Sequence, residues 1–164
     1  MSKARLEAFS DGVIAILITI MVLEFKVPHT TDWATLRALY PSFLTYLLSF
    51  TFLGIYWSNH HHMFHVVKKV TGGVLWANLH LLFWLSLVPF ATGWMGENGF
   101  APLPTALYGV ILLFSAIAYT ILVRIILKAE GHESMLARAI GRDRKGWFSL
   151  ACYVADRKST RLNS

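Results

Sequence analysis

The 164-residue sequence contains a single cysteine, Cys152, and little charge. One cysteine excludes an intramolecular disulfide, and it also excludes a metal site built from several thiolates. Only 15% of the residues are Asp, Glu, Lys or Arg, whereas soluble proteins carry about 25%. The N-terminal region lacks the cleavage pattern of a signal peptide, so its first apolar segment is expected to remain as a helix. These absences argue against a secreted disulfide scaffold and against an ordinary soluble domain.

Long apolar runs dominate the remaining composition. Hydrophobic residues make up 55% of the chain, and the mean hydropathy is +0.52. A helix needs about 20 apolar residues to cross a bilayer, and four runs approach this length, namely residues 9–25, 39–57, 74–94 and 106–127. A fifth run begins at Trp147 and stops at Ala155. The sequence therefore predicts an all-α, polytopic membrane bundle with four complete transmembrane helices and the start of a fifth.

Basic residues are distributed unevenly between the two sides of this bundle. If the spans alternate in direction, ten basic residues fall on the N-terminal side, namely Lys3, Arg5, Lys68, Lys69, Arg124, Lys128, Arg138, Arg142, Arg144 and Lys145. The other side carries only Lys26 and Arg37. Because cytoplasmic segments are enriched in Lys and Arg, this bias places the N-terminus in the cytoplasm. The net charge of +6 is therefore a topology signal, and no aromatic-basic pattern indicates a nucleic-acid partner.

The last nine residues, 156–164, differ in composition from the chain before them, because they read Asp-Arg-Lys-Ser-Thr-Arg-Leu-Asn-Ser. They follow an apolar run that would reach only about 13 Å as a helix, less than half of a bilayer core. The tail resembles a translated sequencing adapter. We expect a single transmembrane domain over residues 1–155, a non-native tail over residues 156–164, and a natural chain that continues beyond Ala155.

The first apolar run carries a carboxylate near its start. Asp11 precedes a stretch from Gly12 to Leu23 without charged side chains, in which Thr19 is the only polar residue. Ionisable groups in or near a membrane are costly unless they are paired, so Asp11 is a candidate functional residue. Arg5 lies on the preceding turns and is a candidate partner, directly or through a neighbouring helix.

Helical geometry groups four residues of this run into one stripe. At 100° per residue, with Asp11 at zero, the angles are about 140°, 80°, 180° and 120° for Ile16, Thr19, Ile20 and Leu23. Asp11 points away from this stripe, so one face of the helix is available to line a space while Asp11 turns toward neighbouring helices. The alternative is a helix whose stripe packs into the bundle core and whose Asp11 only caps the N-terminus.

Four short motifs resemble one known family. The first helix begins with Arg5-x-x-x-Phe9-Ser10-Asp11, and the second ends with Trp57-x-x-His60-x-x-x-Phe64. Asn78 and Pro89 follow on the third run. In order and spacing these residues resemble the transmembrane protein 175 family, the potassium channels of endolysosomes and their shorter prokaryotic relatives. The resemblance covers residues 5–155 and implies six transmembrane helices per repeat and, for the short members, a homotetramer in the prokaryotic cell membrane.

The resemblance also implies a site. The first helix of each subunit would line a central pore for K+, with Ile16, Ile20 and Leu23 as an aliphatic constriction and Thr19 as the polar member of the lining. A hydrophobic ring closes a pore by expelling water. Nothing in the chain resembles the Thr-Val-Gly-Tyr-Gly filter of ordinary potassium channels. The family further implies that Arg5, Asp11, His60 and Asn78 form a polar network that holds the first helix without touching the ion.

Two alternatives remain open at this point. The same scaffold is compatible with a proton pathway, because family members are associated with proton leak. A different class of protein is indicated by four histidines close in sequence, His60, His61, His62 and His65, of which His61 and His65 have the i, i+4 spacing of helical metal ligands. No carboxylate lies near them in sequence, so we expect a structural role for His60 and no metal site. No cofactor and no enzymatic step are expected, and the partners are monovalent cations and the lipid bilayer.

Overall fold

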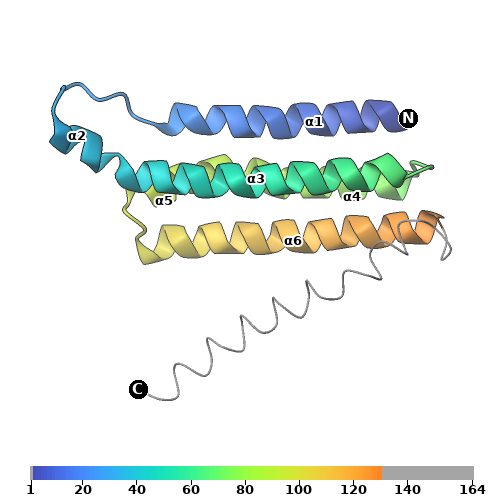
Figure 1. The fold of residues 1–164 in the computed structure, drawn as a ribbon. Helices are drawn as coiled ribbons and strands as arrows, with labels where there is room; N and C mark the ends of the chain where they lie inside the picture. The colour runs from blue at the N-terminus through green and yellow to red at the C-terminus, as the bar shows by residue number, and fades with distance from the viewer. Residues whose placement is uncertain (1, 131–164) are drawn as a thin grey trace, which may run out of the picture.

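The computed structural model describes residues 2–130, and within this range it contains helices and no strands (Figure 1). The helices are α1 (Lys3–Ile20), α2 (Trp33–Ala38), α3 (Tyr40–Val66), α4 (Gly72–Ser86), α5 (Val88–Glu97) and α6 (Pro102–Glu130), with the 3₁₀ turn η1 (Met21–Glu24) directly after α1. The all-α prediction is confirmed over these residues. The fifth apolar run, the domain boundary at Ala155 and the tail lie outside the described residues and stay predictions.

All four expected spans form helices, but their ends differ from the apolar runs. α1 begins at Lys3 and not near residue 9, because charged residues end an apolar run without ending a helix. α3 likewise continues through the histidines to Val66. Within the described residues, the segments Lys3–Glu24, Gly72–Glu97 and Pro102–Glu130 are long and apolar enough to cross a membrane. α3 has sufficient length with 27 residues, although its Ser, Thr, Tyr and His side chains make it less apolar than these three segments.

The third expected span is interrupted near its proline. α4 ends at Ser86 and α5 begins at Val88, with Leu87 between them. Pro89 lies in the first turn of α5, where its missing N–H is tolerated, but it cannot donate to the carbonyl of Leu85 one turn earlier. The two helices therefore form one span with a break in its hydrogen-bond ladder.

The helices pack as a bundle in which α1 and α6 flank the other long helices. α1 packs against α3 and α4, whereas α6 packs against α4 and α5 on the other side (Figure 1). The start of α1, the α3–α4 connection and the end of α6 come together at one end of the bundle (Figure 1). These are the segments that carry the basic residues of the predicted cytoplasmic side within the described range, so the arrangement agrees with the topology read from charge.

A chain of buried hydroxyl groups joins α3, α5 and α6. Thr92 Oγ1 donates to the Val88 carbonyl at 2.7 Å, and Ser49 Oγ lies 2.6 Å from Thr92 Oγ1. Since the Thr92 proton is already used, Ser49 donates to Thr92, and the Tyr108 hydroxyl at 2.9 Å donates to Ser49. This directional chain stabilises three helices in a bilayer, where apolar contact alone distinguishes poorly between helix and lipid.

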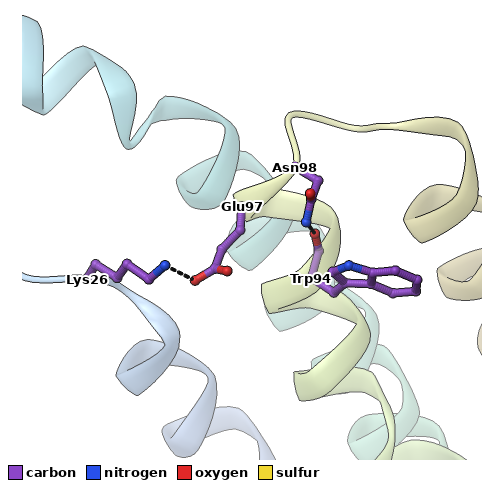
Figure 2. A network of polar contacts seen from close by, with 4 residues as sticks. All are labelled: Lys26, Trp94, Glu97 and Asn98. Atoms are coloured by element: carbon purple, nitrogen blue, oxygen red, sulfur yellow. Dashed lines mark hydrogen bonds and ion pairs between the residues drawn. The ribbon is translucent and has the colours of Figure 1, made fainter.

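The outer end of the bundle is held by polar contacts of the connecting segments. Asp32 accepts from the Thr35 amide at 2.7 Å and caps α2, and this bond holds the pKa of the Asp32 carboxyl below its ordinary value. Lys26, just after η1, forms an ion pair of 2.9 Å with Glu97 at the end of α5 (Figure 2). Beside this pair the Asn98 amide donates to the Trp94 carbonyl at 2.8 Å (Figure 2).

Candidate functional site

α1 has one buried face and one exposed face. The buried face consists of Leu6, Ser10, Ile14 and Leu17, which recur at intervals of three and four residues. These side chains pack against α3, α4 and α5. The opposite face carries Ile16, Thr19 and Ile20, and Leu23 follows in η1. We call these four residues, which helical geometry grouped, the exposed stripe.

The exposed stripe has little contact with the rest of the described bundle. The exposed fractions of its three aliphatic residues are 59% for Ile16, 38% for Ile20 and 77% for Leu23. The alternative in which the stripe packs into the bundle core is therefore wrong for the described residues. Its second element is also wrong, because α1 begins at Lys3 with Ser2 at its cap position, so Asp11 lies in mid-helix.

Thr19 provides the only hydroxyl of the exposed stripe. Its Oγ1 donates to the Ile16 carbonyl at 2.9 Å. Because the proton is directed back to the helix, the oxygen lone pairs remain available as acceptors on the exposed side. The stripe thus presents three aliphatic side chains and one oxygen acceptor. Its surface repels water at Ile16, Ile20 and Leu23 and can accept a hydrogen bond from water or coordinate a cation at Thr19.

The buried face of α1 is tied to α3 and α4 by a second directional chain. His60 Nε2 lies 2.7 Å from Asn78 Oδ1, and Asn78 Nδ2 donates to Ser10 Oγ at 2.8 Å. Ser10 Oγ in turn donates to the Leu6 carbonyl at 2.9 Å. All three side chains are buried, and the His60 ring also stacks on Phe64 with centroids 4.5 Å apart. Among the described residues no buried side-chain nitrogen or oxygen lacks a hydrogen-bond partner, which is the condition for burying polar groups at low cost.

Asp11 turns toward α3 at the edge of this buried face. Its Oδ1 accepts from Trp57 Nε1 at 3.1 Å, so the two motif residues meet across the helices. The Trp57 ring also stacks on His61, with centroids 6.0 Å apart. Asp11 therefore points toward a neighbouring helix, as its angle relative to the stripe indicated.

The four residues of the expected polar network occupy three places in the structure. His60 and Asn78 are in direct contact. Asp11 is bonded to Trp57, and Arg5 is exposed, as is Phe9 from the same motif. Among residues 2–130 no hydrogen bond or ion pair joins Arg5 to Asp11 or to His60. A network that includes Arg5 stays a prediction.

The histidines do not converge on a common point. His60 is buried, whereas His61, His62 and His65 are exposed. His61 and His65 have ring centroids 6.5 Å apart. Within residues 2–130 no three His, Cys, Asp or Glu side chains are grouped as metal ligands would be. The metalloprotein alternative therefore has no support from the described residues.

Two contributors to the site were missed by sequence reasoning. Ser10 was grouped with the signature motif but not with the network, because the periodicity of one helix does not show which of its faces is buried. Trp57 was recognised in its motif, but the Asp11 partner was not foreseen. A residue 46 positions away along the chain leaves no local pattern that identifies it.

Comparison with known proteins connects this geometry to one family. The family model described as "Endosomal/lysosomal potassium channel TMEM175" matches residues 5–89, slightly more than half of the chain. A potassium channel from Chryseobacterium sp. (strain P1-3) is 58% identical over 154 residues, covering 94% of this chain and 80% of that protein. The human endosomal/lysosomal proton channel TMEM175 is 37% identical over 103 residues, which cover 56% of this chain and only 20% of the human protein.

A solved structure shares the fold. The crystal structure of a lysosomal potassium-selective channel TMEM175 homologue from Chamaesiphon minutus is similar with a TM-score of 0.74 and 32% identity. The similarity covers 88% of this chain and 80% of that chain. Since the family model matches more than half of this chain, and the bacterial relative and the solved structure cover 94% and 88% of it, the chain is an integral membrane protein that belongs to the TMEM175 family.

Proposed function

We propose that this chain is the subunit of a channel that conducts K+ passively, with the exposed stripe of α1 lining the pore. The observation that carries the proposal is the stripe itself. It is a row of aliphatic side chains with one hydroxyl, exposed along a helix that is firmly packed on its other face. Support also comes from the similar bacterial proteins, which are named potassium channels or described as potassium-selective.

A single helix cannot enclose a pore, so the proposal includes a homotetramer with α1 of each subunit nearest the axis. Cyclic assemblies place the same surface of every copy around one axis. In such an assembly the rings of Ile16, Ile20 and Leu23 succeed one another over about 10 Å of α1 and the η1 turn that follows it. No cofactor and no enzymatic step are part of the proposal, because passive conduction requires neither.

The aliphatic rings act as a gate that depends on wetting. A narrow apolar constriction expels water and blocks ions, and it conducts when it widens enough to stay filled with water. Such a ring cannot replace the hydration shell of an ion. The Thr19 hydroxyl is the one group of the stripe with free lone pairs, so we assign it the contribution to selectivity among monovalent cations.

The chain from His60 to Ser10 positions the pore helix in this proposal. It binds the face of α1 that lies opposite the stripe and is separated from it by the helix itself. These hydrogen bonds therefore fix how α1 is rotated about its own axis, and with it the direction in which Ile16 points, without contacting the ion. The Asp11–Trp57 bond contributes at the edge of the same face.

The test is ion flux in liposomes that contain the purified full chain. We expect a K+ gradient to drive a larger flux than an equal Na+ gradient, and cross-linking to give four subunits per assembly. A folded tetramer that passes neither ion would contradict the proposal. A monomer or dimer that still conducts would contradict the assignment of the pore to a fourfold axis.

A second candidate function is proton conduction on the same scaffold. The observation that favours it is that the mammalian relatives are named endosomal/lysosomal proton channels. The same liposomes loaded with a pH-sensitive dye distinguish the two functions. Acidification in the absence of a K+ gradient, driven by a proton gradient alone, would favour this second function.

A further inference from the structure

An apolar groove lies at the outer end of the bundle, apart from the proposed pore. It has a volume of about 740 Å³ and is formed where the segment after η1 faces α2 and the start of α3. Its walls include Phe25, Trp33, Leu36, Tyr40 and Phe43. The volume falls in the range of about 300–1,000 Å³ that is typical of pockets for small ligands.

One charged side chain joins this apolar wall. Arg37, in the last turn of α2, also lines the groove. Among residues 2–130 the one ion pair is Lys26–Glu97, so the Arg37 guanidinium has no carboxylate partner there. The nearest acid in sequence, Asp32, caps the opposite end of α2, where it is engaged by Thr35. An apolar groove with one unpaired cation is complementary to an amphiphile with an anionic head.

The position of the groove identifies the kind of amphiphile. α2 lies at the same end of the bundle as the end of α1 and the α5–α6 connection, where the spanning segments stop (Figure 1). Trp33 and Tyr40 are residues that concentrate at the membrane–water interface. At this depth the abundant molecules with an acyl chain and an anionic head are phospholipids, and Arg side chains at the interface attract them.

We propose that this groove binds an anionic phospholipid of the outer leaflet. One acyl chain lies against Leu36 and Phe43, and the phosphate group accepts from the Arg37 guanidinium. The bound lipid contacts Phe25, two residues after Leu23, so it supports the outer end of α1. The inference is independent of ion conduction and does not depend on which cation passes the channel.

The test uses the Trp33 side chain in the groove wall as a reporter. The full chain is placed in vesicles of phosphatidylcholine and phosphatidylglycerol at a constant ratio, and bromine, which quenches tryptophan fluorescence, is carried by one lipid or by the other. The Trp33 signal is the difference between the native chain and Trp33→Phe. We expect half-maximal quenching at an about fivefold lower fraction of brominated lipid when the label is on phosphatidylglycerol, as follows from about 1 kcal/mol per basic residue.

Two variants with the same loss of charge make the test specific. Arg37→Gln should abolish the preference for phosphatidylglycerol, whereas Lys26→Gln, whose side chain is paired with Glu97, should retain it. Equal quenching by both lipids in the native chain would overturn the proposal, as would an equal effect of the two variants. Absence of quenching by either lipid would also overturn it, because the groove would then be covered by another copy of the chain or by residues 131–164.

Discussion

The Nε2 atom of His60 lies 2.7 Å from Oδ1 of Asn78. This contact fixes which atoms donate in the row of hydrogen bonds that joins His60, Asn78 and Ser10 on the buried face of α1. Asn78 uses its amide group to donate to Ser10, so its oxygen is an acceptor. His60 must therefore carry a proton on Nε2. The resulting order of donors runs from α3 through α4 to the carbonyl of Leu6 on α1.

Removing the central member of this chain should destabilise the protein. Asn78→Ala leaves the His60 Nε2–H without an acceptor in a buried site, which costs about 1–3 kcal/mol. The matched control is Asn98→Ala, because exposed Asn98 makes a single bond to the Trp94 carbonyl (Figure 2). Its expected cost is within about 0.5 kcal/mol. Thermal unfolding in detergent compares the two variants. Equal losses of stability would show that the buried hydrogen bonds of Asn78 contribute no more than the exposed hydrogen bond of Asn98.

A polar substitution in the first aliphatic ring should open the proposed gate. Ile16→Asn should let water remain in the constriction and raise K+ flux in liposomes, because wetting is what limits conduction through a hydrophobic ring. Ile55→Asn on α3 is the matched control, since the exposed fraction of Ile55 is 55% against 59% for Ile16. Its flux should remain at the native level. Unchanged flux in folded Ile16→Asn would remove Ile16 from the pore.

Loss of the Thr19 hydroxyl should lower selectivity. Thr19→Val keeps the shape of the side chain but removes the oxygen that accepts from the exposed side. We expect the ratio of K+ to Na+ flux to fall toward one. Thr51→Val is the control, because Thr51 is exposed on α3 and its hydroxyl also donates to a backbone carbonyl, that of Leu47, at 2.9 Å. An unaltered ratio in Thr19→Val would assign selectivity to a different part of the pore.

A methyl group at Gly96 should force α5 away from α3. A Cβ atom there would lie 2.6 Å from Thr45 Oγ1 and 2.8 Å from Ser42 Cα, and the backbone atom cannot rotate aside. Gly96→Ala should therefore cost about 1–3 kcal/mol through overpacking. Gly54→Ala meets no atom within 4 Å and should be neutral or stabilising by about 0.5–1 kcal/mol, as expected for a helix interior. Thermal unfolding of both variants checks the sign of the difference.

The sequence by itself determined the class of the protein, the approximate spans and the stripe on α1. These properties depend on local quantities, namely the length of apolar runs and an angle of 100° per residue. That is why Ile16, Thr19 and Ile20 share a face in the structure, in agreement with their helical angles. The ends of the helices were less accurate, because Lys3 and the histidines after Trp57 reduce hydropathy without breaking a helix.

Only the tertiary structure decided which face of α1 is covered and what covers it. The Asn78–Ser10 bond joins residues 68 positions apart, and the Trp57–Asp11 bond joins residues 46 positions apart. Such contacts depend on the relative rotation and height of two helices, which the periodicity of one helix does not encode. The same holds for the groove beside Arg37, because Phe25 on one wall and residues 33–43 on the other are separated in sequence by the connection between η1 and α2. Local spacing selects the side chains that share a face, and packing between distant helices selects the face that remains open.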